Sequence, residues 1–165
     1  MRILSISICF LFTSFLWSQK YGHVNYRMLL DSIQESKVIN EQLNRYEKSL
    51  SDVGDKMLTK FQENFIKYKA GVEAGTLTAT QRSQMESDLE VEQNAITNYQ
   101  KSANESLEKR NTELLKPLLD KMTEKIKLFA AQEGYSMIFD SSLGLLFTIP
   151  TEDLLGKLVP FIDKK

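Results

Sequence analysis

The sequence predicts an α+β protein, in which a long antiparallel α-helical hairpin is joined to a small β-rich region made from both chain ends. Two observations carry this prediction. No proline precedes Pro117 and no glycine occurs from Thr76 to Glu133, which leaves long stretches free to form helices. Short runs of aromatic and β-branched residues, typical of strands, occur near both ends of the chain.

Residues 1–18 are expected to be a secretory signal peptide. Arg2 supplies one positive charge, and the uncharged run that follows is about 15 residues long, whereas a membrane span needs roughly 20. Small Ser18 marks a candidate cleavage point. An uncleaved membrane anchor is the alternative.

Cleavage after Ser18 leaves 147 of the 165 residues, with 20 basic and 22 acidic side chains and no cysteine. An exported chain without cysteine cannot be a scaffold held together by disulfides. The nearly balanced charge argues against a protein that binds nucleic acid by charge alone.

Two helices are expected over residues 36–72 and 79–116, because apolar residues recur there every three or four positions. The sequence Thr78-x-x-Gln81 is a capping box for the second helix, and Ser32-x-x-Glu35 is expected to start the first. Gly71 and Gly75 can end the first helix, and Gly134 ends the second.

The apolar residues of the two helices fit an antiparallel register. Facing pairs, from Leu43 with Leu107 to Phe65 with Met85, have residue numbers that add to between 150 and 153. In this register Lys60 faces Glu90 and Glu92. Gly54, inside the first helix, is either a bending point or an ordinary packing glycine.

The chain ends are expected to contribute three short strands, at 21–26, 135–140 and 145–149, with a short helix opening at Pro150. Three short strands cannot bury a sheet on their own, so partner strands are expected from further copies of the chain. This divides the protein into a body (19–31 and 130–165) and a helical arm (32–129). The residues expected to form the oligomeric body are Val24, Tyr26, Ile138, Phe139, Leu145 and Phe147.

No pattern for catalysis, metal binding or cofactor binding is present. The chain beyond residue 18 has one histidine, His23, expected to be a surface or packed side chain, and it lacks zinc, nucleophile-elbow, phosphate-loop and calcium-loop motifs. The sequence therefore predicts that the protein is not an enzyme and holds no metal or cofactor.

Several apolar residues near the tip of the hairpin are candidates for binding a partner. Leu58, Ile66 and Val91 lie off the stripe of apolar residues that recurs every three or four positions, and they are expected to stay partly exposed. Phe61, Phe65 and Tyr68 lie on this stripe and are most simply interhelical core. Such residues either pack against a second layer of the protein or bind apolar segments of other chains. The full candidate set is Leu58, Phe61, Phe65, Ile66, Tyr68 and Val91.

The order of several motifs resembles the OmpH/Skp family of periplasmic chaperones. The most specific is LLKPLLDKMTEKI (114–126), followed by FAAQEGY (129–135) and MIFD (137–140). In that family a proline breaks the returning arm, at the place of Pro117 here. Matches to GHVN (22–25), LLF (145–147) and EDLLGKLV (152–159) extend the resemblance over essentially the whole mature chain.

The resemblance implies a homotrimer, in which strands from three subunits form a small β-barrel body and the hairpins project as coiled-coil tentacles around a cavity. It implies an ATP-independent holdase of the periplasm that keeps unfolded outer-membrane β-barrel proteins from aggregating, with the outer-membrane assembly machinery as a further partner. Neither nucleic acid nor a stable membrane span after signal cleavage is expected. The alternative is a non-catalytic structural coiled coil that tethers or spaces components of the cell envelope. Unlike well-known, strongly basic members of that family, this mature chain carries a net charge of −2.

Overall fold

The structure, a computed structural model, describes residues 19–164, which form two compact units. The arm unit is Gln34–Asp120, and the body unit comprises the described residues of Met1–Ile33 and Lys121–Lys165. The predicted signal peptide lies outside the described residues.

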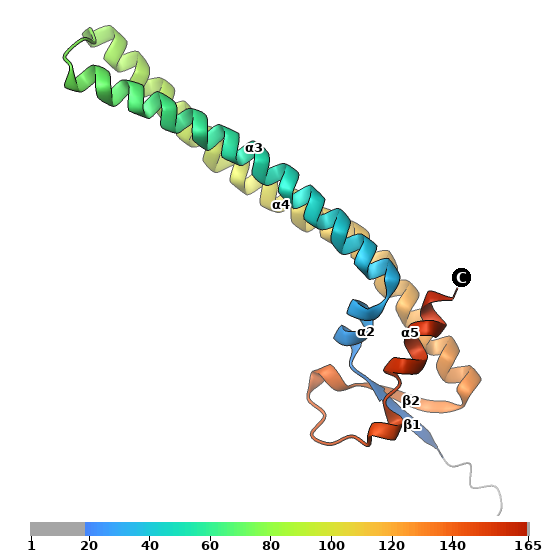
Figure 1. Cartoon of the computed structure of the whole chain (residues 1–165). Helices are drawn as coiled ribbons and strands as arrows, with labels where there is room; N and C mark the ends of the chain where they lie inside the picture. Colours follow the sequence, from blue (N-terminus) through green and yellow to red (C-terminus); the bar gives the residue numbers. More distant parts are fainter. Residues whose placement is uncertain (1–18, 165) are drawn as a thin grey trace, which may run out of the picture. The chain divides into compact units, whose positions relative to one another are not determined.

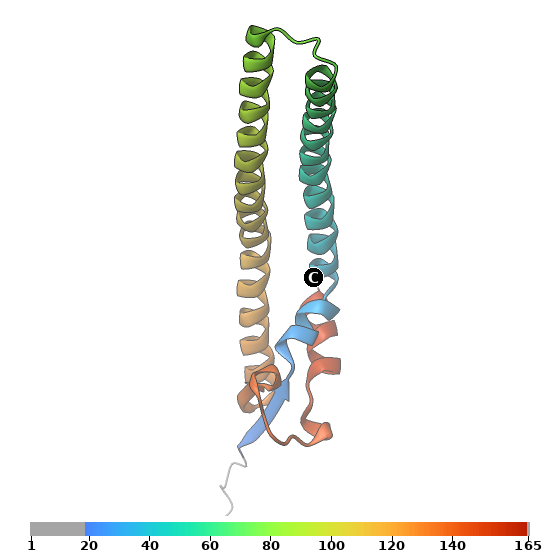
Figure 2. The ribbon, with the colours of Figure 1, turned by 90° about the vertical axis from the view of Figure 1, so that its left-hand side faces the viewer.

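The arm unit is built from two long helices, α3 (Gln34–Glu73) and α4 (Ala79–Glu133), of which α4 continues into the body unit. In the arm they lie side by side and run in opposite directions (Figures 1 and 2). The predicted pair of long helices is confirmed.

The break expected at Pro117 is not present, since α4 is continuous through it. A proline removes one helical hydrogen bond, and Leu118, on the turn that follows, is almost fully buried and anchors the helix there.

The turn at the tip follows the sequence prediction closely. The N–H groups of Gly75 and Thr76 donate to the carbonyls of Val72 and Gly71, over 3.1 Å in both cases, and Gly75 has the positive φ of 63° that this helix end requires. The capping box is reciprocal: the Gln81 N–H donates to Thr78 Oγ1 over 3.2 Å, and Thr78 N–H donates to Gln81 Oε1 over 3.0 Å.

Polar contacts between the helices match the predicted register. Lys60 Nζ lies 3.1 Å from a carboxylate oxygen of Glu92, and the Asn64 amide donates to both oxygens of that carboxylate, over 2.9 and 3.1 Å. Of the two partners predicted for Lys60, Glu92 makes the contact and Glu90 does not. The hydrogen bonds from Asn64, and then the Lys60 ammonium, lower the pKa of Glu92.

This contact makes the stability of the arm depend on pH. Because the pKa of Glu92 is lower in the folded state than in the unfolded chain, its contribution is complete above the ordinary glutamate pKa and is lost as pH falls through the lowered value. Glu92→Gln should therefore lower stability by about 1 kcal/mol at neutral pH and by less at acid pH. Thermal melts of both proteins from neutral pH down to about pH 3 measure this difference. Glu90→Gln controls for the lost charge, and a difference that grows on acidification would contradict the assignment.

Gly54 packs against the facing helix and does not interrupt α3. A Cβ atom built at this position would lie 3.5 Å from the nearest ring carbon of Tyr99, which is an ordinary van der Waals contact. Alanine therefore fits, and its higher helix propensity should raise stability by about 0.5–1 kcal/mol. Gly134→Ala should lower stability by a similar amount, because Gly134 ends α4 with a φ of 74°. Thermal unfolding of the two variants distinguishes these opposite signs, and destabilisation by Gly54→Ala would show that Tyr99 must move.

The body unit contains a parallel two-stranded sheet of β1 (Lys20–Val24) and β2 (Tyr135–Asp140). Gly22 pairs with Ile138 and Val24 with Asp140. The Lys20 ammonium donates to the carbonyl of Glu133 over 3.0 Å, at the C-terminus of α4 where a positive charge is favourable.

The N-terminal segment differs from the prediction after Val24. The expected strand at 21–26 ends there, and the side chain of Asn25 accepts a hydrogen bond from the Met28 N–H over 3.0 Å, which starts α2 (Tyr26–Ser32). Ser32 does not start the first long helix as predicted. It is the last residue of α2, and its hydroxyl donates to the Met28 carbonyl over 2.7 Å.

The third predicted strand, at 145–149, is not a strand in the protomer, where no strand of the described chain pairs with it. It connects two short 3₁₀ turns, η1 (Ser141–Leu143) and η2 (Pro150–Glu152). The helix expected to open at Pro150 instead starts later, as α5 (Leu155–Asp163). Between η2 and α5, the Leu154 N–H donates to the carbonyl of His23 over 2.9 Å, which ties this part of the chain to β1.

The core of the body unit lies between α2, α5, the sheet and the last turns of α4. The Phe129 ring stacks on Tyr135, with ring centroids 5.9 Å apart, and meets the edge of Phe161 at 5.3 Å. The buried apolar side chains of this unit are Val24, Leu29, Ile33, Met122, Phe129, Tyr135, Leu154, Leu158 and Ile162.

Candidate functional site

The first candidate surface is the arm patch, which consists of the six predicted partner-binding residues Leu58, Phe61, Phe65, Ile66, Tyr68 and Val91. Ile66 and Val91 are the most exposed of them, at 65% and 64%, and Leu58 and Phe65 are also exposed. Phe61 and Tyr68 are half-buried. The hairpin therefore leaves large apolar side chains in contact with solvent on both of its helices.

Part of the arm patch is held by contacts within the arm. The rings of Phe61 and Phe65 stack with centroids 6.2 Å apart, and the Tyr68 hydroxyl donates to the Glu86 carboxylate. That hydrogen bond, together with one from Arg82, lowers the pKa of Glu86. Tyr68 is thus positioned by a partner on α4, whereas Ile66 and Val91 remain mostly exposed to solvent.

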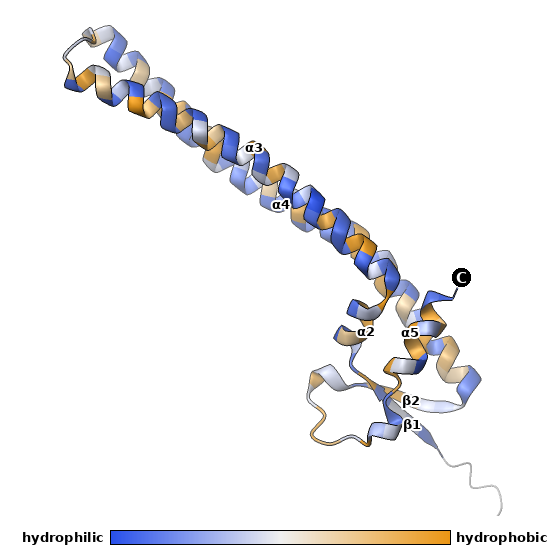
Figure 3. Ribbon diagram, in the orientation of Figure 1, coloured by the Kyte–Doolittle hydropathy of each residue, from blue (hydrophilic) through white to orange (hydrophobic). Residues whose placement is uncertain are grey.

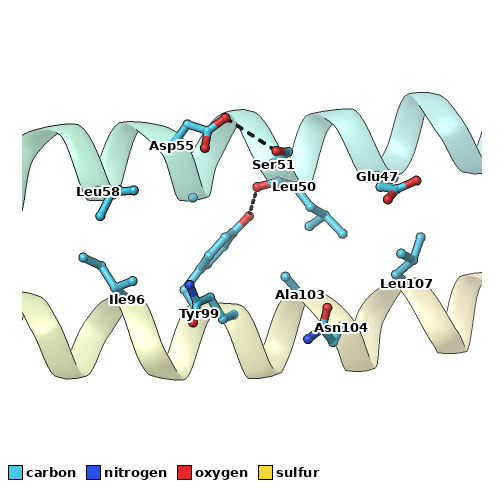
Figure 4. A pocket seen from close by; sticks show the side chains of 12 residues that line it. Glu47, Leu50, Ser51, Asp55, Leu58, Ile96, Tyr99, Ala103, Asn104 and Leu107 are labelled. Atoms are coloured by element: carbon cyan, nitrogen blue, oxygen red, sulfur yellow. Dashed lines mark hydrogen bonds between the residues drawn. The ribbon is translucent and has the colours of Figure 1, made fainter.

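A groove between α3 and α4, halfway along the arm, is a feature that sequence reasoning missed. The Tyr99 ring reaches across it from α4, and its hydroxyl donates to the backbone carbonyl of Leu50 over 2.8 Å (Figure 4). The hollow has a volume of about 400 Å³. The lining includes the small residues Gly54 on α3 and Ala103 on α4, which bring too little volume to fill the space between the helices. The available signal was Gly54 inside the first predicted helix and the small Ala103 among the apolar residues of the second.

The second candidate surface is the body patch, which consists of the predicted oligomerisation residues. Phe147 is 83% exposed, and Phe139 and Leu145 are each 43% exposed, so these three offer apolar surface. Tyr26 and Ile138 are half-buried. Val24, by contrast, is buried at 2% exposure and packs inside the protomer.

The segment around Phe147 exposes more apolar surface than the prediction named. Leu143 and Leu146 are as exposed as Phe147 or more so, and Ile149 is also exposed. Figure 3 shows this segment, between η1 and η2, as a hydrophobic stretch of the body unit. Such a continuous exposed apolar stretch is typical of a surface that takes part in an interaction.

His23 lies beneath this segment as a packed histidine. It is 8% exposed, its Nε2 lies 3.3 Å from the carbonyl oxygen of Ile149, and its Nδ1 is buried without a hydrogen-bond partner. The contact of the His23 imidazole with the Ile149 carbonyl thus holds the end of the exposed segment.

The described residues contain neither a cluster of three or more histidine, cysteine or carboxylate side chains that could hold a metal ion nor a helix long and apolar enough to cross a membrane.

Comparison with known proteins places these features in context. The family model described as "Outer membrane protein (OmpH-like)" matches residues 20–159. The fold is similar to the crystal structure of a candidate outer membrane chaperone (OmpH-like) from Caulobacter crescentus CB15, with a TM-score of 0.76 and 12% sequence identity. That match covers 88% of this chain and 84% of the other. No curated protein matches the sequence.

Proposed function

Because the chain belongs to the OmpH-like outer membrane protein family, we propose that it is an ATP-independent holdase chaperone for unfolded outer-membrane β-barrel proteins. It acts in the periplasm, after removal of residues 1–18. It is not an enzyme and uses no cofactor. The observation that carries the proposal is the exposed apolar surface of the arm patch, on helices that leave it open to a client.

The active form proposed is a homotrimer held together by the body patch. Within the described residues β2 pairs only with β1, so its second edge is free to accept a strand. The exposed segment at residues 145–149, which is neither helix nor strand in the single chain, is suited to supply one to a neighbouring copy. Strands exchanged in this way around three subunits make a closed β-barrel body, and the arms then enclose a cavity for the client. Release to the outer-membrane assembly machinery needs no nucleotide, because each apolar contact is weak and reversible.

The test is suppression of aggregation. The purified mature chain should keep an unfolded outer-membrane β-barrel protein soluble on dilution from denaturant, followed by light scattering. Replacing two exposed side chains of the arm patch, Ile66→Ser with Val91→Ser, should weaken protection by about tenfold or more, because burying each apolar side chain on the client contributes about 1–2 kcal/mol.

A matched control separates this surface from general apolar exposure. Val38→Ser with Leu128→Ser removes two exposed apolar side chains that lie outside the arm patch, and it should leave protection unchanged. Absence of protection by the wild-type oligomer would exclude the holdase function and would favour a structural coiled coil that tethers one defined envelope component.

A further inference from the structure

The groove of the arm is longer than the hollow beside Tyr99. A second hollow of about 370 Å³ adjoins the first and shares Glu47, Asn104 and Leu107 with it, so the two form one continuous groove along the arm. Its apolar lining comes from both helices and consists of Leu43, Leu50, Leu58, Ile96, Ala103 and Leu107.

The charged residues that line this groove all have the same sign. Glu47 and Asp55 from α3 and Glu108 from α4 contribute carboxylates, whereas no lysine or arginine of the described chain lines either hollow. Glu47, Ser51 and Asp55 follow one another at four-residue spacing, which places them on one face of α3. None of the three carboxylates forms an ion pair within residues 19–164. Their charge is therefore available to a partner.

The groove is held open by the protein itself. The hydrogen bond from the Tyr99 hydroxyl to the Leu50 carbonyl fixes the ring against Gly54 and spaces the two helices there (Figure 4). A groove that exists before binding costs less free energy to occupy than one that must be opened.

We propose that this groove binds client segments in which an apolar core is flanked by lysine or arginine. The inference rests on the proposed holdase function and names the chemistry of the segments that this site selects. Apolar client side chains enter the hollows beside Leu50, Leu58 and Leu107, and flanking cations meet the carboxylates at the rim. Opposite charges attract over a groove of low polarity and steer the segment into it.

The direct test uses short fluorescent peptides with one apolar core, Leu-Phe-Leu, flanked by lysines, serines or glutamates. Fluorescence anisotropy with the full mature oligomer should give about tenfold tighter binding for the lysine peptide than for the glutamate peptide, as expected of two or three exposed charge pairs. Added salt should reduce this preference, because exposed charges are screened.

Variants locate the preference in the groove. Glu47→Gln with Asp55→Asn should abolish most of the difference between the lysine and glutamate peptides. Glu63→Gln with Glu90→Gln removes the same number of charges from residues that do not line the groove, and it should leave the difference intact. Loss of the preference in both variants would show that net charge and not the groove decides it.

A reporter placed in the groove gives an independent readout. The mature chain has no cysteine, so Ser51→Cys, which lines the groove, and Ser49→Cys, which does not, can each carry one environment-sensitive dye. The lysine peptide should shift the emission of the dye at position 51 and not at position 49. A dye at position 51 that is already shielded in the peptide-free oligomer, and released on dilution to protomers, would assign the groove to a second copy of the chain and overturn the proposal.

The outcomes for the two proposals are separable. If the wild type suppresses client aggregation but shows no charge preference among the peptides, the groove inference fails and the holdase function stands. If the wild type protects no client, the holdase function fails. The response of the dye at position 51 to the lysine peptide then decides separately whether the groove binds such segments.

Discussion

Phe147→Asp should convert the proposed homotrimer into folded single protomers. In the protomer Phe147 is 83% exposed, so the aspartate is solvated there and costs the fold little. In a subunit interface the same carboxylate is buried without a partner, at a cost of several kcal/mol for each copy. Sedimentation equilibrium should show a protomer mass, and circular dichroism should show unchanged helix content.

Two further variants make this result specific. Phe139→Asp should also dissociate the oligomer, because Phe139 lies on β2 and is 43% exposed on the same surface. Leu128→Asp introduces the same charge at an exposed apolar position of α4 outside the body patch, and it should leave the oligomer intact. If both phenylalanine variants remain oligomeric, the proposal that strands of three subunits form a common β-barrel body is wrong.

Leu158→Ala is expected to have the largest effect on the stability of the body unit. Leu158 is fully buried on α5, and α5 packs on α2, where Leu29 is also fully buried. Truncation to alanine removes apolar burial and leaves a cavity, which together lower the free energy of unfolding by about 2–5 kcal/mol. Urea unfolding followed by circular dichroism measures the loss, at one fixed protein concentration because association also contributes.

Leu128→Ala supplies the comparison for this change. It removes the same atoms from a side chain that is 53% exposed, so the expected loss is below about 1 kcal/mol. Equal losses for the two variants would mean that α5 does not pack in the body core as described.

The hairpin could be predicted from sequence because its determinants are local. Helix period, the glycine-free stretch and the capping box of Thr78 with Gln81 act over a few residues, and each was confirmed. The contact of Lys60 with Glu92 followed as well, because two helices joined by a short turn can shift little along each other. The groove beside Gly54 was not predicted, since it depends on the volumes that facing side chains leave unfilled.

The body could be predicted only in part. The strand predicted at 135–140 is β2 with the same bounds. The strand predicted at 21–26 is shifted to Lys20–Val24, and α2 follows Asn25 where this strand was predicted to continue. The expected strand at 145–149 fails because a strand needs a hydrogen-bonding neighbour, and the described protomer provides none for this segment. Helices α2 and α5 are short, so their bounds depend on packing more than on propensity.

The amino-acid sequence by itself determined the long hairpin, its turn and its register, because helix hydrogen bonds and caps join residues that are close along the chain. Only the tertiary structure decided the parallel pairing of β1 with β2, the burial of His23 and Val24, and the exposure of Phe147 and Leu146. Those features depend on contacts between residues more than 100 positions apart, such as Val24 with Asp140. No short-range pattern specifies such contacts, since many segments of similar composition could pair equally well.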